Sequence, residues 1–236
     1  MFFFDPLYFV FALPPMLFAL WAQYKVKSAF QKYSQVRSMH NISGLETARI
    51  LMQNEGLHSL QVNQVPGQLT DFYNPADKSI NLSQGSVLPS VAGMAIVAHE
   101  LGHAVQDQQG YVWMRARGSI VGIANLGTNL GPLLFFLGMV LGGFTRSPLG
   151  WNIAFLGFLL FAGAVLFTLL TLPVEFNASN RARVMLMNNG LVSAQEMDGV
   201  NAVLNAAALT YVAGAAQAIA NLLYYALILF GVHHDD

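Results

Sequence analysis

Four long stretches of this chain contain no charged residue, and they restrict its possible folds more than any other feature of the sequence. They cover residues 6–24, 118–145, 147–174 and 199–232, and all are apolar in bulk. A helix needs about 20 residues to cross the hydrocarbon layer of a bilayer, so each stretch is long enough or nearly so. We therefore predict a mainly α membrane protein with four transmembrane helices, at 6–24, 118–143, 150–173 and 209–232.

The composition agrees with a membrane protein and excludes several other classes. Charged residues make up 10% of the chain, against roughly 25% in ordinary soluble domains. The 11 basic and 12 acidic residues nearly balance, so no basic surface for nucleic acid is indicated. Cysteine is absent, so disulfides and thiolate ligands are excluded, and any metal must be held by histidines and carboxylates.

Basic residues are distributed unevenly among the segments that connect the predicted spans. Residues 25–117 contain eight lysines and arginines, the short segment 144–149 contains only Arg146, and 175–198 contains Arg181 and Arg183. The positive-inside rule therefore places 25–117 and 175–198 on the cytoplasmic side of the membrane and both termini outside.

The segment between the first two spans, residues 25–117, is polar enough to form a soluble α+β domain. Ser43 and Glu46 have the spacing of a capping box, and Gly56 is placed as a stop, which predicts a helix over 44–55. Alternating side chains predict a small antiparallel sheet, with strands over 60–65, 69–73 and 79–82. Pro89 and Ser90 then begin an apolar segment that we predict to be helical over about 90–109.

This last helix carries the sequence His99-Glu100-Leu101-Gly102-His103, an H-E-x-x-H motif. The spacing of four residues places both imidazoles on one helix face, where they can bind a single zinc ion. Glu100 lies beside them and is suited to take a proton from metal-bound water. We predict one zinc ion per chain, with His99 and His103 as ligands and Glu100 as general base.

A catalytic zinc needs one more protein ligand and an open position for water. Gln109 stands where a metzincin would have its third histidine, so that pattern is excluded. Glu175 follows the third predicted span on the side of the soluble domain, and Glu196 and Asp198 are rival carboxylates. Asp107, one turn beyond His103, could instead accept a hydrogen bond from a ligand histidine.

Three segments together resemble the YugP-type neutral zinc metallopeptidases of bacterial membranes, over nearly the whole chain. They are Ala98–Ala104, Val65-Pro66-Gly67-Gln68-Leu69 and Leu172-Pro173-Val174-Glu175-Phe176. The resemblance implies a zincin-like domain in the bacterial cytoplasmic membrane and makes Glu175 the third zinc ligand, beside His99 and His103. Related membrane peptidases usually have an aspartate four residues beyond the third ligand, where Ser179 stands here. Asn177, Ser179 and Asp107 are therefore candidates for orienting a ligand histidine.

The implied activity is that of a zinc metalloendopeptidase, which hydrolyses peptide bonds in a peptide or protein substrate. Arg181, Arg183 and Tyr211 are candidates for stabilising the oxyanion, because they lie near Glu175 in the chain. A strand at 69–73 or 79–82 could bind an extended substrate at a sheet edge. Predicted partners are this substrate and the lipid bilayer, not nucleic acid.

Two other functional classes compete with the peptidase. A non-catalytic scaffold or chaperone-like adaptor could use zinc for folding alone, although such a site has no need of Glu100. A small transporter would require ionisable residues inside the spans, and the first three have none. Glycine and alanine are frequent over 118–143 and 202–220, which favours close helix packing within one chain and also between copies of it.

Overall fold

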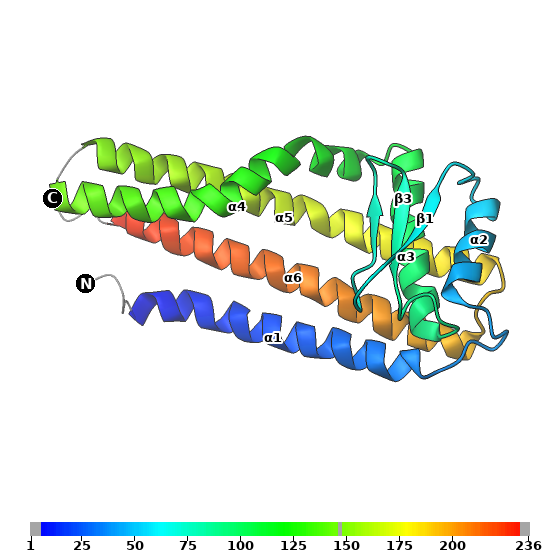
Figure 1. The fold of residues 1–236 in the computed structure, drawn as a ribbon. Coiled ribbons are helices and arrows are strands. Elements are labelled where there is room, and N and C mark those ends of the chain that lie inside the picture. The colour runs from blue at the N-terminus through cyan, green and yellow to red at the C-terminus, as the bar shows by residue number, and fades with distance from the viewer. Residues whose placement is uncertain (1–5, 146–147, 232–236) are drawn as a thin grey trace. The chain divides into compact units, whose positions relative to one another are not determined.

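The computed structural model describes residues 6–145 and 148–231 and is mainly helical (Figure 1). Its helices are α1 (Pro6–Ser34), α2 (Gly44–Asn54), α3 (Val91–Gln108), α4 (Val112–Thr145), α5 (Pro148–Asn188) and α6 (Ala194–Gly231). Its strands are β1 (Gln61–Val65), β2 (Phe72–Asn74) and β3 (Ser79–Ser83). Four of the described helices, α1, α4, α5 and α6, are long and apolar enough to cross a membrane, which agrees with the number of spans predicted.

These four helices are longer than the predicted spans. The third predicted span ends at residue 173, whereas α5 continues without a break from Pro148 through Pro173 to Asn188. Beyond the proline, α5 buries Val174, Ala178, Ala182 and Leu186 at a spacing of four residues. This repeat gives the extension a buried face of its own, which stabilises it as a helix. The predicted span 209–232 falls within α6 up to Gly231, and residue 232 lies outside the described residues.

The chain forms two compact units. Unit 1 contains residues up to Trp21, Ala116–Leu172 and the residues from Tyr211 onward, and unit 2 contains Ala22–Arg115 and Pro173–Thr210. The predicted soluble segment 25–117 falls in unit 2 up to Arg115 and makes up only part of that unit. The ends of α5 and α6 complete this unit because they supply buried apolar residues to its core, among them Ala182, Met185, Leu186, Val200, Val203 and Leu204.

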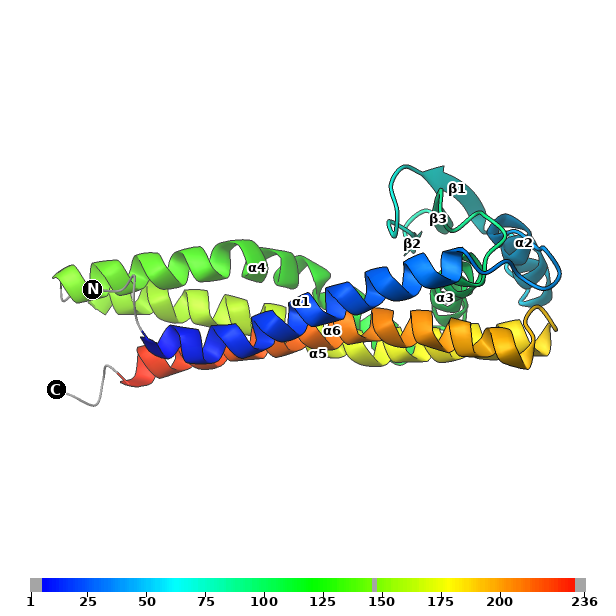
Figure 2. The same cartoon turned by 90° about the horizontal axis from the view of Figure 1, so that it is seen from below.

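Unit 1 has an aromatic core. Phe135 of α4 stacks on Tyr225 of α6, with ring centroids 4.4 Å apart, and Phe161 of α5 packs against the same tyrosine. The helices α4 and α5 lie side by side (Figures 1 and 2), and glycines allow this close approach. A Cβ atom added at Gly138, for example, would lie 2.2 Å from the backbone nitrogen of Ala154. Part of the glycine content of 118–143 thus serves packing within the chain.

The sheet of unit 2 is mixed, with strand order β1-β3-β2. β3 pairs antiparallel with β2 as expected, but it pairs in parallel with β1, so the prediction of an antiparallel sheet is wrong. The alternation of side chains identifies strands, but it does not show which strands pair or in which direction. The path of the chain between β1 and β3 decides both. β2 is also shorter than the predicted strand 69–73 and begins at Phe72, because Gly67 and Leu69 have positive φ angles that are incompatible with an extended strand.

The remaining local signals in unit 2 are confirmed. The Ser43 side chain accepts a hydrogen bond from the backbone of Glu46 at the start of α2, and Gly56 has φ +69° just after its end. Ser90 caps α3 by accepting from the backbone of Gly93 at 3.0 Å. α2 packs against α3, and α3 also contacts β2 and β3. This helix is therefore fixed on several sides by the core of unit 2.

Candidate metal centre

The two histidines of the H-E-x-x-H motif lie on a buried stretch of α3. Their rings are one turn apart, with centroids separated by 4.8 Å. His99 is 9% exposed and His103 is 8% exposed, and neighbouring apolar residues such as Ala98 and Leu101 are fully buried. The predicted helix and the predicted pairing of the two imidazoles on one face are thus present.

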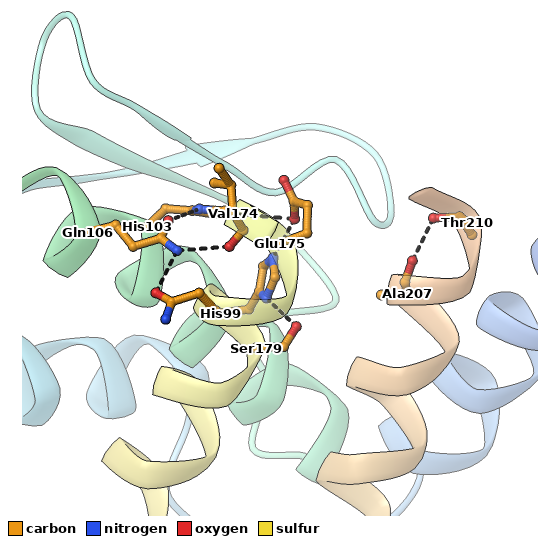
Figure 3. Close-up of polar contacts among 9 residues, drawn as sticks. His99, His103, Gln106, Val174, Glu175, Ser179, Ala207 and Thr210 are labelled. Atoms are coloured by element: carbon orange, nitrogen blue, oxygen red, sulfur yellow. Dashed lines mark hydrogen bonds and ion pairs between the residues drawn. The ribbon is translucent and has the colours of Figure 1, made fainter. Parts of the chain in front are cut away.

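Glu175 meets both histidines from α5. Its Oε2 atom lies 3.2 Å from His99 Nε2 and 3.5 Å from His103 Nε2, and the side chain is almost completely buried (Figure 3). Each of the three residues offers a ligand atom, and these atoms all lie within 4.8 Å of one another. Among the described residues this is the one His and carboxylate group with a geometry that could hold a metal ion.

A glycine allows α5 to approach α3 at this point. A Cβ atom added at Gly102 would lie 2.6 Å from the carbonyl oxygen of Ala178, so any larger side chain would push the two helices apart. Gly102 directly precedes His103, and Ala178 is three residues beyond Glu175. The close contact therefore joins the turn of α3 that carries the histidines to the turn of α5 that carries the carboxylate.

The second nitrogen of each imidazole has its own hydrogen-bond partner (Figure 3). His99 Nδ1 lies 3.1 Å from the Ser179 hydroxyl, and His103 Nδ1 lies 3.0 Å from Gln106 Oε1. Histidine ligands of metals almost always bond through their other nitrogen to a nearby polar group. Two imidazole nitrogens and one carboxylate oxygen, each imidazole oriented in this way, form a donor set that fits a catalytic zinc ion.

The residues predicted to orient a histidine have different positions. Ser179 contacts His99 directly, whereas the Asn177 Oδ1 atom accepts hydrogen bonds from Gln106 Nε2 and Arg181 Nε and so lies one step away from His103. The expectation for Asp107 is corrected, because its carboxylate accepts from the Tyr73 hydroxyl and from Lys78 Nζ instead. These contacts join the end of α3 to β2 and to the turn before β3.

Gln106 was missed in the sequence. A signal for it exists: Gln106 is a polar residue one turn after His103, directly at the end of the apolar part of the helix, and in the structure its side chain is fully buried. The sequence favours Asp107, the next residue, because carboxylates are common acceptors for ligand histidines. The helical position of each side chain, rather than its chemical type, decides which of the two faces the site.

The rival carboxylates are not part of the metal-binding group. Glu196 accepts hydrogen bonds from the backbone nitrogen and the hydroxyl of Ser193, both at 2.8 Å, and from the Met39 backbone at 2.6 Å. It therefore caps the start of α6, as its capping-box spacing predicts. Asp198 likewise does not belong to the group.

The three candidates for an oxyanion donor make other contacts or belong elsewhere. Arg181 bonds to Asn177 and lies over the ring of Tyr111, and Arg183 bonds to Asn201 and Asn205 of α6, both at 2.7 Å. Tyr211 belongs to unit 1, whereas the metal-binding group is in unit 2. Their role in stabilising an oxyanion stays a prediction.

Glu100, between the two histidines in the motif, is 8% exposed. Burial raises the pKa of its carboxyl group, while the electrostatic interaction with His99 and His103 acts in the opposite direction. A buried carboxyl group with a shifted pKa is typical of functional sites. The role of Glu100 in proton transfer stays a prediction.

The chain is similar to known proteins over nearly its whole length. The profile of a family described as "Putative neutral zinc metallopeptidase" matches residues 8–230. The chain is also 40% identical over 219 residues to a Bacillus subtilis (strain 168) protein named "Putative membrane protease YugP". That alignment covers 92% of this chain and 94% of the relative. No solved structure matches the chain, so the zincin-like character of unit 2 stays a prediction.

Proposed function

Because this chain belongs to the neutral zinc metallopeptidase family, we propose that it is a membrane zinc endopeptidase with its active centre at His99, His103 and Glu175. The observation that carries this proposal is the convergence of two imidazole nitrogens and one carboxylate oxygen beside the buried Glu100. One zinc ion held there would supply Lewis-acid polarisation of a peptide carbonyl and a lowered pKa of water.

The protein's own residues account for the proton transfers. Glu100 accepts the proton of the attacking water and then donates it to the nitrogen of the leaving amine. No side chain needs to form a covalent bond with the substrate.

We propose that an extended substrate binds along β2. β3 is paired on both sides, so residues 79–82 have no free edge, whereas β2 is an edge strand of the sheet. β2 contacts α3, and the negative charge of Asp71, the residue before β2, contributes to raising the pKa of the Glu100 carboxyl group. A peptide that adds to this edge through backbone hydrogen bonds would pass near the general base.

The orientation in the membrane is proposed from charge alone. Eight basic residues in 25–117 favour a cytoplasmic position for the metal centre, with both termini outside. A reporter fused to the C-terminus that proved cytoplasmic would contradict this orientation.

The proposed activity is tested on the full-length protein in detergent, by zinc content and by cleavage of a quenched unfolded protein. Glu100→Gln should retain zinc and lower the cleavage rate by about 10²–10⁴-fold, because it removes the general base. Glu46→Gln, at an exposed position on α2, is the matched control and should behave like wild type. Zinc-loaded wild type that cleaves no unfolded substrate would instead favour the scaffold.

A further inference from the structure

A buried glutamine connects the two helices that supply the metal-binding group. Gln106 is fully buried on α3, and its side chain makes three hydrogen bonds. Its Oε1 atom lies 3.0 Å from His103 Nδ1, and its Nε2 atom donates to the Val174 carbonyl at 2.8 Å and to Asn177 Oδ1 at 2.9 Å. Val174 and Asn177 flank Glu175 on α5, so this one side chain contacts both parts of the site (Figure 3).

The partners of Gln106 fix the orientation of its amide group. A backbone carbonyl can only accept, so the amide nitrogen must face Val174 and the amide oxygen must face His103. Asn177 is fixed in the same way, because Arg181 Nε can only donate and therefore requires the Asn177 oxygen at 2.7 Å. The Val174 carbonyl and the Arg181 guanidinium thus require the same arrangement of hydrogen bonds, in which Gln106 donates to Asn177 and accepts from His103.

This arrangement determines which ring nitrogen of a neutral His103 carries the hydrogen. The Gln106 amide oxygen cannot donate, so the hydrogen of a neutral His103 ring must be on Nδ1. Its Nε2 atom then carries the lone pair and faces Glu175 Oε2. A lone pair at this position is what a metal ion requires of a histidine ligand. The Ser179 hydroxyl beside His99 can both donate and accept, so it does not impose a tautomer in the same way.

We infer that Gln106 is a positioning residue for zinc: it holds His103 in the tautomer that binds metal through Nε2 and fixes the Glu175 turn of α5 relative to α3. The inference rests on the proposed function, since it assumes that zinc is the ion bound by His99, His103 and Glu175. Gln106 itself does not contact the reacting atoms.

The test compares zinc affinity in three variants of the full-length protein in detergent, by competition with a chelator. Gln106→Met keeps the length of the side chain and removes all three hydrogen bonds, so zinc binding should weaken by about 10–100-fold. Gln106→Glu keeps an acceptor for His103 Nδ1 but cannot donate to the Val174 carbonyl or to Asn177, so it should bind zinc more tightly than Gln106→Met and less tightly than wild type. Gln108→Met is the matched control, an exposed glutamine two residues further along α3, and should not change zinc affinity.

A second readout separates a change in ligand geometry from a loss of stability. The visible absorption spectrum of bound Co²⁺ reports the ligands and their arrangement, so it should change in Gln106→Met and stay as in wild type in Gln108→Met. Thermal unfolding of the zinc-free proteins measures how much each substitution affects the fold.

The outcomes distinguish this inference from the proposed function. Wild type without zinc affinity would overturn the proposed function, and the role of Gln106 with it. Wild-type affinity and an unchanged cobalt spectrum in Gln106→Met would overturn only the role of Gln106. If Gln106→Met does not fold, Gln106→Glu decides: weaker zinc binding with a changed cobalt spectrum supports the inference, and wild-type affinity with an unchanged spectrum contradicts it.

Discussion

The two compact units bury different kinds of side chain. Of the polar and charged residues buried among the described part of the chain, all except Thr171 belong to unit 2. Unit 1 buries an aromatic and small-residue core and leaves large apolar residues on its surface, for example Leu126, Leu133, Phe155, Leu159 and Leu223. An apolar surface suits lipid, and buried polar groups held by hydrogen bonds suit chemistry. The helices α5 and α6 run through both units. Each of them therefore has one part in the unit with the apolar surface and another part in the core of the unit that contains the metal-binding group.

The largest expected effect is the loss of the metal from unit 2. Glu175→Ala removes a ligand, so zinc affinity should fall by more than the roughly 10–100-fold that loss of an orienting residue causes. Glu196→Ala removes a carboxylate of the same unit that serves as a helix cap, and should leave zinc bound. Metal analysis after gel filtration measures both. Zinc that is retained in Glu175→Ala and lost in Glu196→Ala would show that the third ligand is misassigned.

One leucine in each half of α5 is substituted to compare how much a leucine side chain stabilises each unit. Leu186 is fully buried in the core of unit 2, so Leu186→Ala should lower the free energy of unfolding by about 2–5 kcal/mol. Leu159 is 49% exposed in unit 1, and Leu159→Ala should change it by only about 0.5 kcal/mol. Thermal unfolding in detergent, read by loss of zinc and of helical circular dichroism, checks both. Equal losses would contradict the difference in burial.

Alanine substitutions at two glycines, one in each unit, test the same comparison of the two units. Gly102→Ala places a methyl group against the Ala178 carbonyl oxygen, so α3 and α5 must separate, at a cost of about 1–3 kcal/mol. Gly118, on α4 in unit 1, has no atom within 4 Å of an added Cβ, so Gly118→Ala should be neutral or stabilising by up to about 1 kcal/mol. Unfolding and zinc affinity are measured together, and Gly102→Ala should lower both. Tight zinc binding in Gly102→Ala would mean that the close approach of the helices is not needed for the site.

The smallest effect concerns the capping box of α6. Ser193→Ala removes the hydroxyl that accepts from the Glu196 backbone, which should cost about 1 kcal/mol of unfolding free energy. Zinc affinity should stay unchanged, because Ser193 makes no part of the metal-binding group. Ser119→Ala, in the interior of α4, is the control and should have almost no effect. A decrease in zinc affinity in Ser193→Ala would couple the start of α6 to the metal centre.

Local patterns in the sequence were enough to predict several features of this protein. The four apolar helices, the caps at Ser43, Ser90 and Ser193, and the pairing of His99 with His103 all depend on residues within a few positions of one another. Helical periodicity and hydrogen bonding within one turn are enough to specify such features. The sequence also identified Glu175 as a candidate, from its place after the third span and from the resemblance.

Only the tertiary structure decided which distant segments meet. Glu175 lies 76 residues from His99, the parallel pairing of β1 with β3 bypasses β2 in the chain, and Gln106 faces His103 while Asp107 next to it faces Tyr73. The continuation of α5 into unit 2 follows from burial against a core that other segments complete. Contacts of this kind depend on packing between elements, and spacing along one element does not specify them.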